Sequence, residues 1–180
     1  MALAPTTKLF STEDCKIQRL LTDPEGGSPT YGPMIDVPGI RQVTLTPEFE
    51  SKQLRGDNKE LDSDTVMVAA TIGWDYAKLS YAALEVFIGG TWDGTEYTRS
   101  QSDYLPSWRM TWKTPTNGGS DIGGDVHFEV GKAKVTAHNL GTAFEDYQLL
   151  NATARCNFRL ADGKLFGIIP HETAEALASA

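Results

Sequence analysis

The fold is decided by the stretch Val43-Thr44-Leu45-Thr46-Pro47-Glu48-Phe49-Glu50 and by a second stretch, Thr65 to Trp74. In the first, Val43, Leu45 and Phe49 fall on one face, which is the period of a half-buried β-strand. The second alternates in the same way, and one side of it carries Val66, Val68, Ala70, Ile72 and Trp74. A turn, Leu54-Arg55-Gly56-Asp57-Asn58, lies between them. The chain therefore predicts a long hairpin.

The connection between the two stretches, roughly residues 51–64, is almost wholly polar. Its charged residues are Lys52, Arg55, Asp57, Lys59, Glu60, Asp62 and Asp64. Charged side chains cannot enter a core unless they are paired. The connection is therefore expected to be an extended loop that lies in solvent or docks on a partner. Alternatively, its strands continue to pair outward and make a projecting β-arm.

A helix is predicted from Tyr76 to Ile88, directly after the hairpin. Asp75 can serve as its N-cap, and Gly89-Gly90 ends it because glycine adopts positive φ without strain. Apolar residues fall on one side at helical spacing, which predicts a helix that covers an open sheet face. The residues expected to pack on that face are Leu79, Ala83, Leu84 and Phe87.

Further strand-like segments fill most of the remaining chain, at residues 14–21, 105–112, 125–138, 146–160 and 165–169. Loops dense in glycine, proline and polar residues separate them. Residues 1–12 are expected to form an N-terminal arm, and residues 170–180 a C-terminal arm or short helix. The chain has 180 residues, of which 40% are hydrophobic, which suits one two-layer β domain spanning residues 1–180.

Charge and apolar content exclude some functions. The net charge of -8 disfavours attraction to DNA or to an anionic membrane. It does not forbid handling DNA, because a surface that lets DNA slide past should not grip phosphates. The chain has no run of about 18 apolar residues, so no transmembrane helix is expected. The first residues do not have the form of a secretory signal. Cys15 and Cys156 could pair if their strands are neighbours, but buried free thiols are favoured.

Candidate catalytic and metal-binding residues do not form a recognisable site. His127, His138 and His171 are scattered, and no Cys-x-x-Cys completes a zinc set. Four other patterns suggest a site at first sight. They are the start of a calcium loop at Asp62-x-Asp64, an adhesion triplet at Arg55-Gly56-Asp57, a glycine-rich phosphate loop at residues 118–124, and an acid–base pair among Asp121, Asp125 and Glu129. Ordinary turns and loops explain each of these patterns better. The sequence therefore predicts no catalysis, no cofactor and no metal.

An aromatic cluster suggests a different function. It consists of Trp92, Tyr97, Tyr104, Trp108 and Trp112. Such a cluster can form a platform for sugar binding, although core packing and interface anchoring are its more common roles.

The order of these elements resembles a known family. A strand with Val43-Thr44-Leu45 is followed by Leu54-Arg55-Gly56-Asp57-Asn58, then Leu61-Asp62, a second alternating strand, and a helix that ends in Phe87-Ile88-Gly89-Gly90. This arrangement resembles the major tail (tail tube) proteins of long-tailed, non-contractile bacteriophages. The resemblance covers roughly residues 36–90, and residues 91–124 match no family element.

The resemblance implies two antiparallel sheets packed as a β-sandwich or open barrel, with one flanking α-helix. It also implies hexameric rings that stack into a tube through which viral DNA passes without specific binding. The tape measure protein, the tail terminator and the tail-tip proteins would be partners, and the location would be the virion tail, assembled in the host bacterial cytoplasm. The residues implied to contact a neighbouring subunit or ring are Lys52, Leu54, Arg55, Asp57, Asn58, Lys59, Glu60 and Asp62.

Two other functions remain open at this stage. One is a β-sandwich module for carbohydrate binding or adhesion that uses the aromatic cluster. The other is a small barrel for an apolar ligand, or an enzyme of another type, which requires a cavity with converging polar groups. A tube subunit is expected to assemble as its concentration rises, whereas these alternatives are not.

Overall fold

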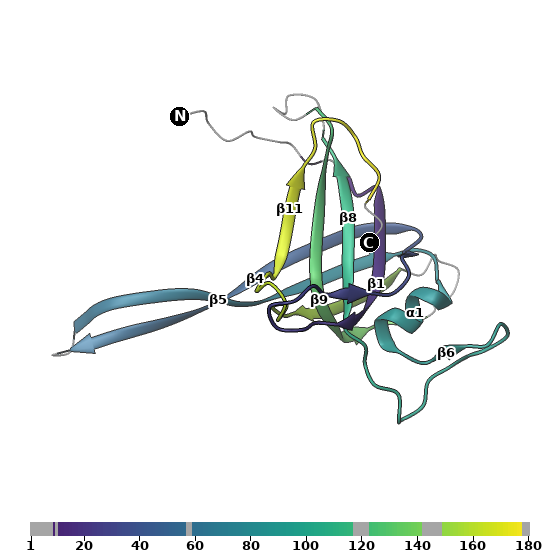
Figure 1. The fold of residues 1–180 in the computed structure, drawn as a ribbon, viewed down its shortest axis with the longest axis horizontal. Coiled ribbons are helices and arrows are strands. Elements are labelled where there is room, and N and C mark those ends of the chain that lie inside the picture. Colours follow the sequence, from purple (N-terminus) through teal and green to yellow (C-terminus); the bar gives the residue numbers. More distant parts are fainter. Residues whose placement is uncertain (1–8, 10, 57–58, 117–122, 142–148, 178–180) are drawn as a thin grey trace.

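Antiparallel strands make up most of the computed structural model (Figure 1). It describes residues 9, 11–56, 59–116, 123–141 and 149–177, and only the backbone at 54–56 and 59–61. The elements are β1 (Asp14–Thr22), β2 (Thr30–Tyr31), β3 (Ile35–Asp36), β4 (Ile40–Gly56), β5 (Lys59–Tyr76), α1 (Tyr81–Ile88), β6 (Thr91–Trp92), β7 (Tyr97–Thr98), β8 (Trp108–Pro115), β9 (Asp125–His138), β10 (Leu150–Cys156) and β11 (Phe166–Pro170).

The main sheet has the strand order β2-β1-β8-β9-β10-β5-β4, with β3 added on β1 and β11 added on β9. Its long strand β9 belongs to two layers. Residues Val126–Val130 of β9 pair with both β8 and β11, whereas Ala133–His138 pair with β10. In Figure 1 the layer of β1, β8, β9 and β11 stands upright, and β4 and β5 run across it. The mainly antiparallel fold with one flanking helix is as the sequence predicted.

The core lies between the two layers and α1. Trp74 of β5, Phe87 of α1 and Trp108 of β8 pack together, with ring centroids 4.8–5.4 Å apart. Strand β10 alternates buried and exposed residues along its whole length, which places Leu150, Ala152, Ala154 and Cys156 in the core. The period-two pattern of this strand therefore has its expected cause, one face on a core and one in solvent.

Helix α1 begins later than the sequence predicts. It starts at Tyr81, and its N-cap is Ser80, whose Oγ accepts a hydrogen bond from the Ala83 amide. The predicted first residue, Tyr76, is instead the last residue of β5, paired with Ile40 on one side and Leu150 on the other. Pairing on both sides stabilises the extended conformation there, so the predicted N-cap at Asp75 is wrong.

The late start also changes which residues pack the helix on the sheet. Ala83, Leu84 and Phe87 are buried. Leu79 precedes the helix and is 46% exposed, so its predicted packing role is wrong. The helical spacing placed Leu79 on the apolar side only for a helix that continued back to Tyr76.

The end of α1 gives a test of backbone geometry. Gly90 has φ +87°, and an added Cβ would lie 2.5 Å from the Thr98 carbonyl oxygen and 2.9 Å from Tyr97 Oη. Gly90→Ala is expected to lower the free energy of unfolding by about 1 kcal/mol for the positive φ and by roughly 1–3 kcal/mol more for the overlap. The matched control is Gly94→Ala, at φ +98° with open space around it. Equal losses in urea titrations of the two variants would contradict this packing.

The connection from β10 to β11 is held by a polar network that the sequence does not reveal. The Arg159 guanidinium lies over Gly131, where an added Cβ would be 2.7 Å from Arg159 Cδ. Arg159 pairs with Glu129 at 3.0 Å and with Asp162 at 2.6 Å, and it donates to Tyr31 Oη. Burial raises the pKa of Asp162, but hydrogen bonds from Arg159 and from the Lys164 amide together hold it below its usual value.

The predicted arms at the two chain ends differ in what the structure describes. Most of residues 1–12 lie outside the described residues, and Leu9 forms a single bridge with Thr116. The segment after β11 folds back on β9, where the Glu175 amide donates to Asp125 Oδ2 and Leu177 is buried. The segment passes so close to Gly124 that a Cβ there would lie 2.4 Å from the His171 carbonyl oxygen. Residues 171–177 are therefore docked, and residues 178–180 lie outside the described residues.

Candidate assembly surface

Strands β4 and β5 continue to pair well beyond the body of the protein. Their register runs from Ile40↔Tyr76 to Gly56↔Lys59. Strand β10 accompanies β5 only as far as Ala70, and among the described residues no other strand pairs with the part beyond it. Residues 48–56 and 59–69 therefore form a two-stranded ribbon, here called the arm, which projects from the body (Figure 1). The predicted loop at 51–64 is wrong, and the alternative of a projecting β-arm is correct.

The described side chains of the outer part of the arm, at 51–53 and 62–65, are all polar and exposed. Ser51 Oγ and Thr65 Oγ1 form a cross-strand hydrogen bond of 2.7 Å, and Lys52 and Asp62 are exposed. The residues that the resemblance implicates in contacts are distributed as follows: Lys52, Leu54 and Arg55 on β4, Lys59, Glu60 and Asp62 on β5, and Asp57 and Asn58 outside the described residues.

The base of the arm is apolar and exposed. Phe49 is 65% exposed and Val66 is 48% exposed, and Val68 beside them is also exposed. A β-bulge explains this arrangement, because Glu48 pairs with Ala69 while Phe49 pairs with Met67, which leaves Val68 without an opposite residue. The prediction that Val66 and Val68 share the core face of Ala70, Ile72 and Trp74 is therefore wrong. Sequence alternation alone cannot locate a bulge.

An apolar groove opens between the two layers on the side of β4. It has a volume of about 520 Å³. Its apolar lining consists of Val43, Leu45 and Pro47 of β4, Trp112 and Phe128, whose rings stack at 5.2 Å, Phe166 and Ile168 of β11, and Leu9. The groove exists because β4 and β11 do not pair with each other. In the part of the chain that the structure describes, β4 pairs only with β5, and β11 only with β9. Two free strand edges therefore flank the groove.

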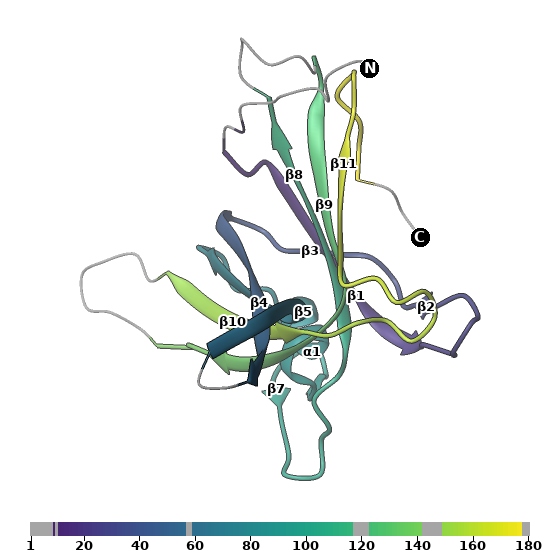
Figure 2. The same cartoon turned by 90° about the vertical axis from the view of Figure 1, so that its left-hand side faces the viewer.

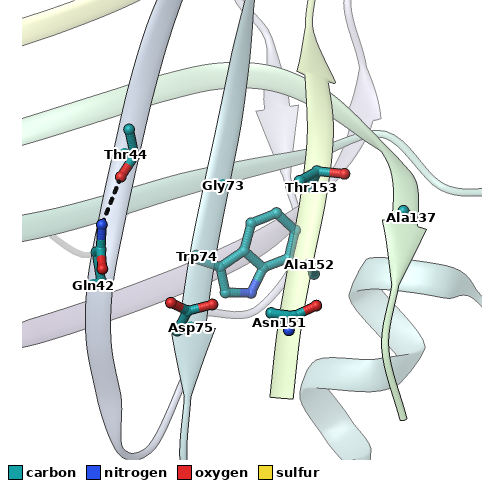
Figure 3. A pocket seen from close by; sticks show the side chains of 9 residues that line it. All are labelled: Gln42, Thr44, Gly73, Trp74, Asp75, Ala137, Asn151, Ala152 and Thr153. Atoms are coloured by element: carbon teal, nitrogen blue, oxygen red, sulfur yellow. Dashed lines mark hydrogen bonds between the residues drawn. The ribbon is translucent and has the colours of Figure 1, made fainter. Parts of the chain in front are cut away.

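The opposite face of β4, β5, β10 and β9 is polar and shallow. A depression of about 300 Å³ lies around Gly73, and Figure 3 shows the residues that line it. Its polar side chains are Gln42, Thr44, Asp75, Asn151 and Thr153, and Gln42 Nε2 donates to Thr44 Oγ1. Arg155 on the same face pairs with Glu48 at 3.3 Å. This face offers hydroxyl and amide groups. Arg155 is neutralised by Glu48, and Lys134, its cross-strand partner on β9, is exposed and has no ion-pair partner among the described residues.

The aromatic cluster does not form one surface. Trp108 is 0% exposed and Trp112 is buried. Trp92 stacks on Tyr81 of α1 at 4.1 Å, with their planes 3° apart. Tyr104 is 91% exposed, and Tyr97 donates to the Gly89 carbonyl oxygen. The predicted alternative, a sugar platform built from residues 92–112, therefore lacks two of its three tryptophans.

The half-buried His138 predicts a dependence of stability on pH. The Tyr76 hydroxyl and His138 Nε2 lie 2.8 Å apart under α1, and burial lowers the pKa of His138 below 6.5. The unfolded chain therefore takes up this proton at a higher pH than the folded chain. Stability is expected to fall as pH drops below about 6.5, by at most about 1.4 kcal/mol per pH unit. The lowered pKa of Asp162 also makes stability fall as pH drops, but only below pH 3.8.

This expectation is checked by urea titrations at pH 5 and pH 7. His138→Gln is expected to reduce the loss of stability between the two values, because the titrating group is gone. Tyr76→Phe is the control, since it removes the hydroxyl partner and keeps the imidazole. An unchanged loss in the glutamine variant would show that another group carries the dependence.

The described residues contain no arrangement of side chains suited to metal binding or to reactive thiol chemistry. Within them, no group of three or more histidine, cysteine or acidic residues could hold a metal ion. Cys15 and Cys156 are both buried and unbridged. Burial raises the pKa of both thiols, that of Cys156 to about 12, so neither is a reactive thiolate at neutral pH. None of the helices described is long and apolar enough to cross a membrane.

Comparison with known proteins adds no identification. Neither the protein-family models nor the curated proteins give a match to the chain. The functional argument therefore rests on the arm, the open groove, the two free strand edges and the polar sheet face.

Proposed function

We propose that this chain is a virion structural protein that self-assembles into hexameric rings, stacked as the tail tube of a long-tailed bacteriophage. The observation that carries this proposal is the arm, which leaves the body and exposes Phe49 and Val66 at its base. A two-stranded ribbon has little stability alone. Contact with another subunit supplies the missing layer.

The open strand edges support the same function. An unpaired edge offers backbone donors and acceptors to another chain, and in the described part of the chain β4 carries such an edge along residues 40–52. A head-to-tail contact that closes gives a ring, and axial repetition of rings gives a filament. The arm and the edges together supply contacts in two directions, around a ring and between rings.

The polar face around Gly73 suits the wall of a conduit. Its side chains include Gln42, Thr44, Asn151 and Thr153, and its Arg155 is paired with Glu48. Phosphate binding depends on lysine and arginine side chains. In the described part of the chain this face has one lysine without an ion-pair partner, Lys134, and its other polar groups are mainly hydroxyls and amides, so its hold on passing DNA is weak. In this role the protein is no enzyme and needs no cofactor.

In the tube, the partners are further copies of the chain, the tape measure protein, the tail terminator and the tail-tip proteins. Assembly takes place in the host bacterial cytoplasm, and the finished protein lies in the virion tail.

Light scattering across a concentration series tests this function. The weight-average mass of the purified chain is expected to rise steeply above a threshold concentration, as in nucleated assembly. A binding module gives one constant mass throughout. A mass that stays at 19.6 kDa at every concentration would argue against self-assembly.

A further inference from the structure

The apolar base of the arm exposes Phe49, Val66 and Val68, whereas Met67 is partly buried against the core. Phe49 and Met67 are cross-strand partners on one face of the ribbon, and Val66 pairs with Glu50. Phe49 and Val66 therefore lie on opposite faces of the ribbon, and the exposed aromatic ring of Phe49 has the form of an interface anchor.

The groove has the chemistry to receive such an anchor. The stacked rings of Trp112 and Phe128, together with Leu45, give it an apolar wall. Its volume of about 520 Å³ is large enough for a phenyl ring and its neighbours. Aromatic anchors that fill apolar pockets dominate the energies of protein interfaces.

The arm cannot fill the groove of its own chain. Phe49 lies on β4, and Val43, Leu45 and Pro47 of the same strand form one wall of the groove. The strand runs straight on from that wall into the arm, away from β8 and β11 (Figures 1 and 2). An extended strand cannot fold back across its own wall, so an arm that enters this groove belongs to another molecule.

Charge complementarity indicates that this molecule is a second copy. Arg41 lines the groove and is exposed, and it has no ion-pair partner among the described residues. Glu50 follows Phe49 directly on the arm, and it too is exposed and has no such partner there. The arm thus carries a ring on one face of its strand and a carboxylate on the other, and the groove carries an aromatic wall on β8 and β9 and a guanidinium on its β4 wall.

We propose that the arm base of one copy docks in the groove of the next copy, with Phe49 against the Trp112–Phe128 stack and Glu50 near Arg41. The contact is heterologous, because arm and groove are different surfaces of the same chain, and it therefore propagates from copy to copy. The inference rests on the proposed self-assembly and names the surface that receives the arm.

Cross-linking of mixed variants tests the docking. Phe49→Cys and Ile168→Cys are made in separate chains, one of which bears an affinity tag, and the mixture is treated with a short bis-maleimide. The native thiols are buried, so wild-type protein serves as the blank. Thr46→Cys, on the opposite face of β4, replaces Phe49→Cys in the control mixture. The expected product is a dimer of unlike chains, at a yield at least about tenfold above the control.

Three results overturn the docking. They are no cross-link in the Phe49–Ile168 mixture, equal yields with Thr46→Cys, and a predominance of Phe49–Phe49 dimers, which means that two arms pair with each other. Hollow tubes in the absence of the Phe49–Ile168 product overturn the docking and leave the tube function standing. The Phe49–Ile168 product without tubes supports the docking and contradicts the tube function.

A charge exchange gives a second, independent measurement. Arg41→Glu and Glu50→Arg are each expected to weaken association about tenfold, by opposing like charges across the contact. The double variant carries both changes in every copy and is expected to recover most of the loss. Failure of the double variant to recover, with both single variants folded by circular dichroism, contradicts the proposed pairing of these two residues.

Discussion

Deleting residues 52–63, with an Asn-Gly turn inserted between Ser51 and Asp64, removes the outer arm and keeps Phe49 and Glu50 at its base. The deletion is expected to abolish the stacking of rings into tubes and leave the body folded. The deleted segment lies beyond Ala70, the last residue of β5 that β10 reaches. Its loss therefore removes no core side chain, and an Asn-Gly hairpin turn suits the twist of the shortened strands. The free energy of unfolding is expected to change by less than about 1 kcal/mol. Urea titration and electron microscopy measure the two effects.

The deletion variant also makes a sharp control when it is mixed with wild-type protein. It keeps the groove, Phe49 and Glu50 and lacks the outer arm, so it can join a neighbour through the arm base but offers no outer-arm contact to the next ring. Small amounts are expected to shorten wild-type tubes in proportion to their fraction. If the variant polymerises like wild type, the role assigned to the arm is wrong.

Trp108→Ala is expected to cause the largest loss of stability. The ring is 0% exposed and meets Trp74 and Phe87 edge-on, with centroids 5.4 Å away in each case. Truncating a buried tryptophan costs about 3–5 kcal/mol, out of a total of about 5–15 kcal/mol for a typical domain. Urea unfolding followed by circular dichroism measures the loss.

Trp92→Ala is the matched control, because Trp92 is half-buried and stacks only on Tyr81 in the described part of the molecule. It is expected to lose less than about 1.5 kcal/mol. The comparison also separates the proposed function from a sugar-binding module. If Trp108 belonged to a ligand platform, its replacement would abolish binding and leave the fold intact. A fully stable Trp108→Ala protein would contradict the core described above.

The hairpin and the buried face of β10 could be predicted from the sequence, because period-two alternation has one physical cause there. Val43 and Leu45 face the interior from β4, as do Ala152 and Ala154 from β10. Local alternation records which face of a strand is buried. The alternation predicts the buried face correctly wherever one face of a strand lies on a core along its whole length.

The errors arise where tertiary contacts override local pattern. The predicted helix start at Tyr76 is wrong because pairing with Ile40 and Leu150 extends β5 through that residue. The exposure of Val66 and Val68 follows from a bulge, which changes the face of every residue beyond it.

The groove could not have been predicted. It depends on two strands far apart in the chain, β4 and β11, lying near each other without pairing. Its aromatic wall comes from Trp112 and Phe128, which the sequence presents as ordinary strand residues. The arm residues, by contrast, were correctly recognised as unable to enter a core, because their charges alone exclude them.

Negative-stain electron microscopy of the concentrated wild-type protein, with light-scattering mass beside it, tests the central claim most directly. The account predicts hollow tubes of stacked rings, with sixfold symmetry in end-on views. Monomers alone at every concentration, or closed particles that do not stack, would contradict it.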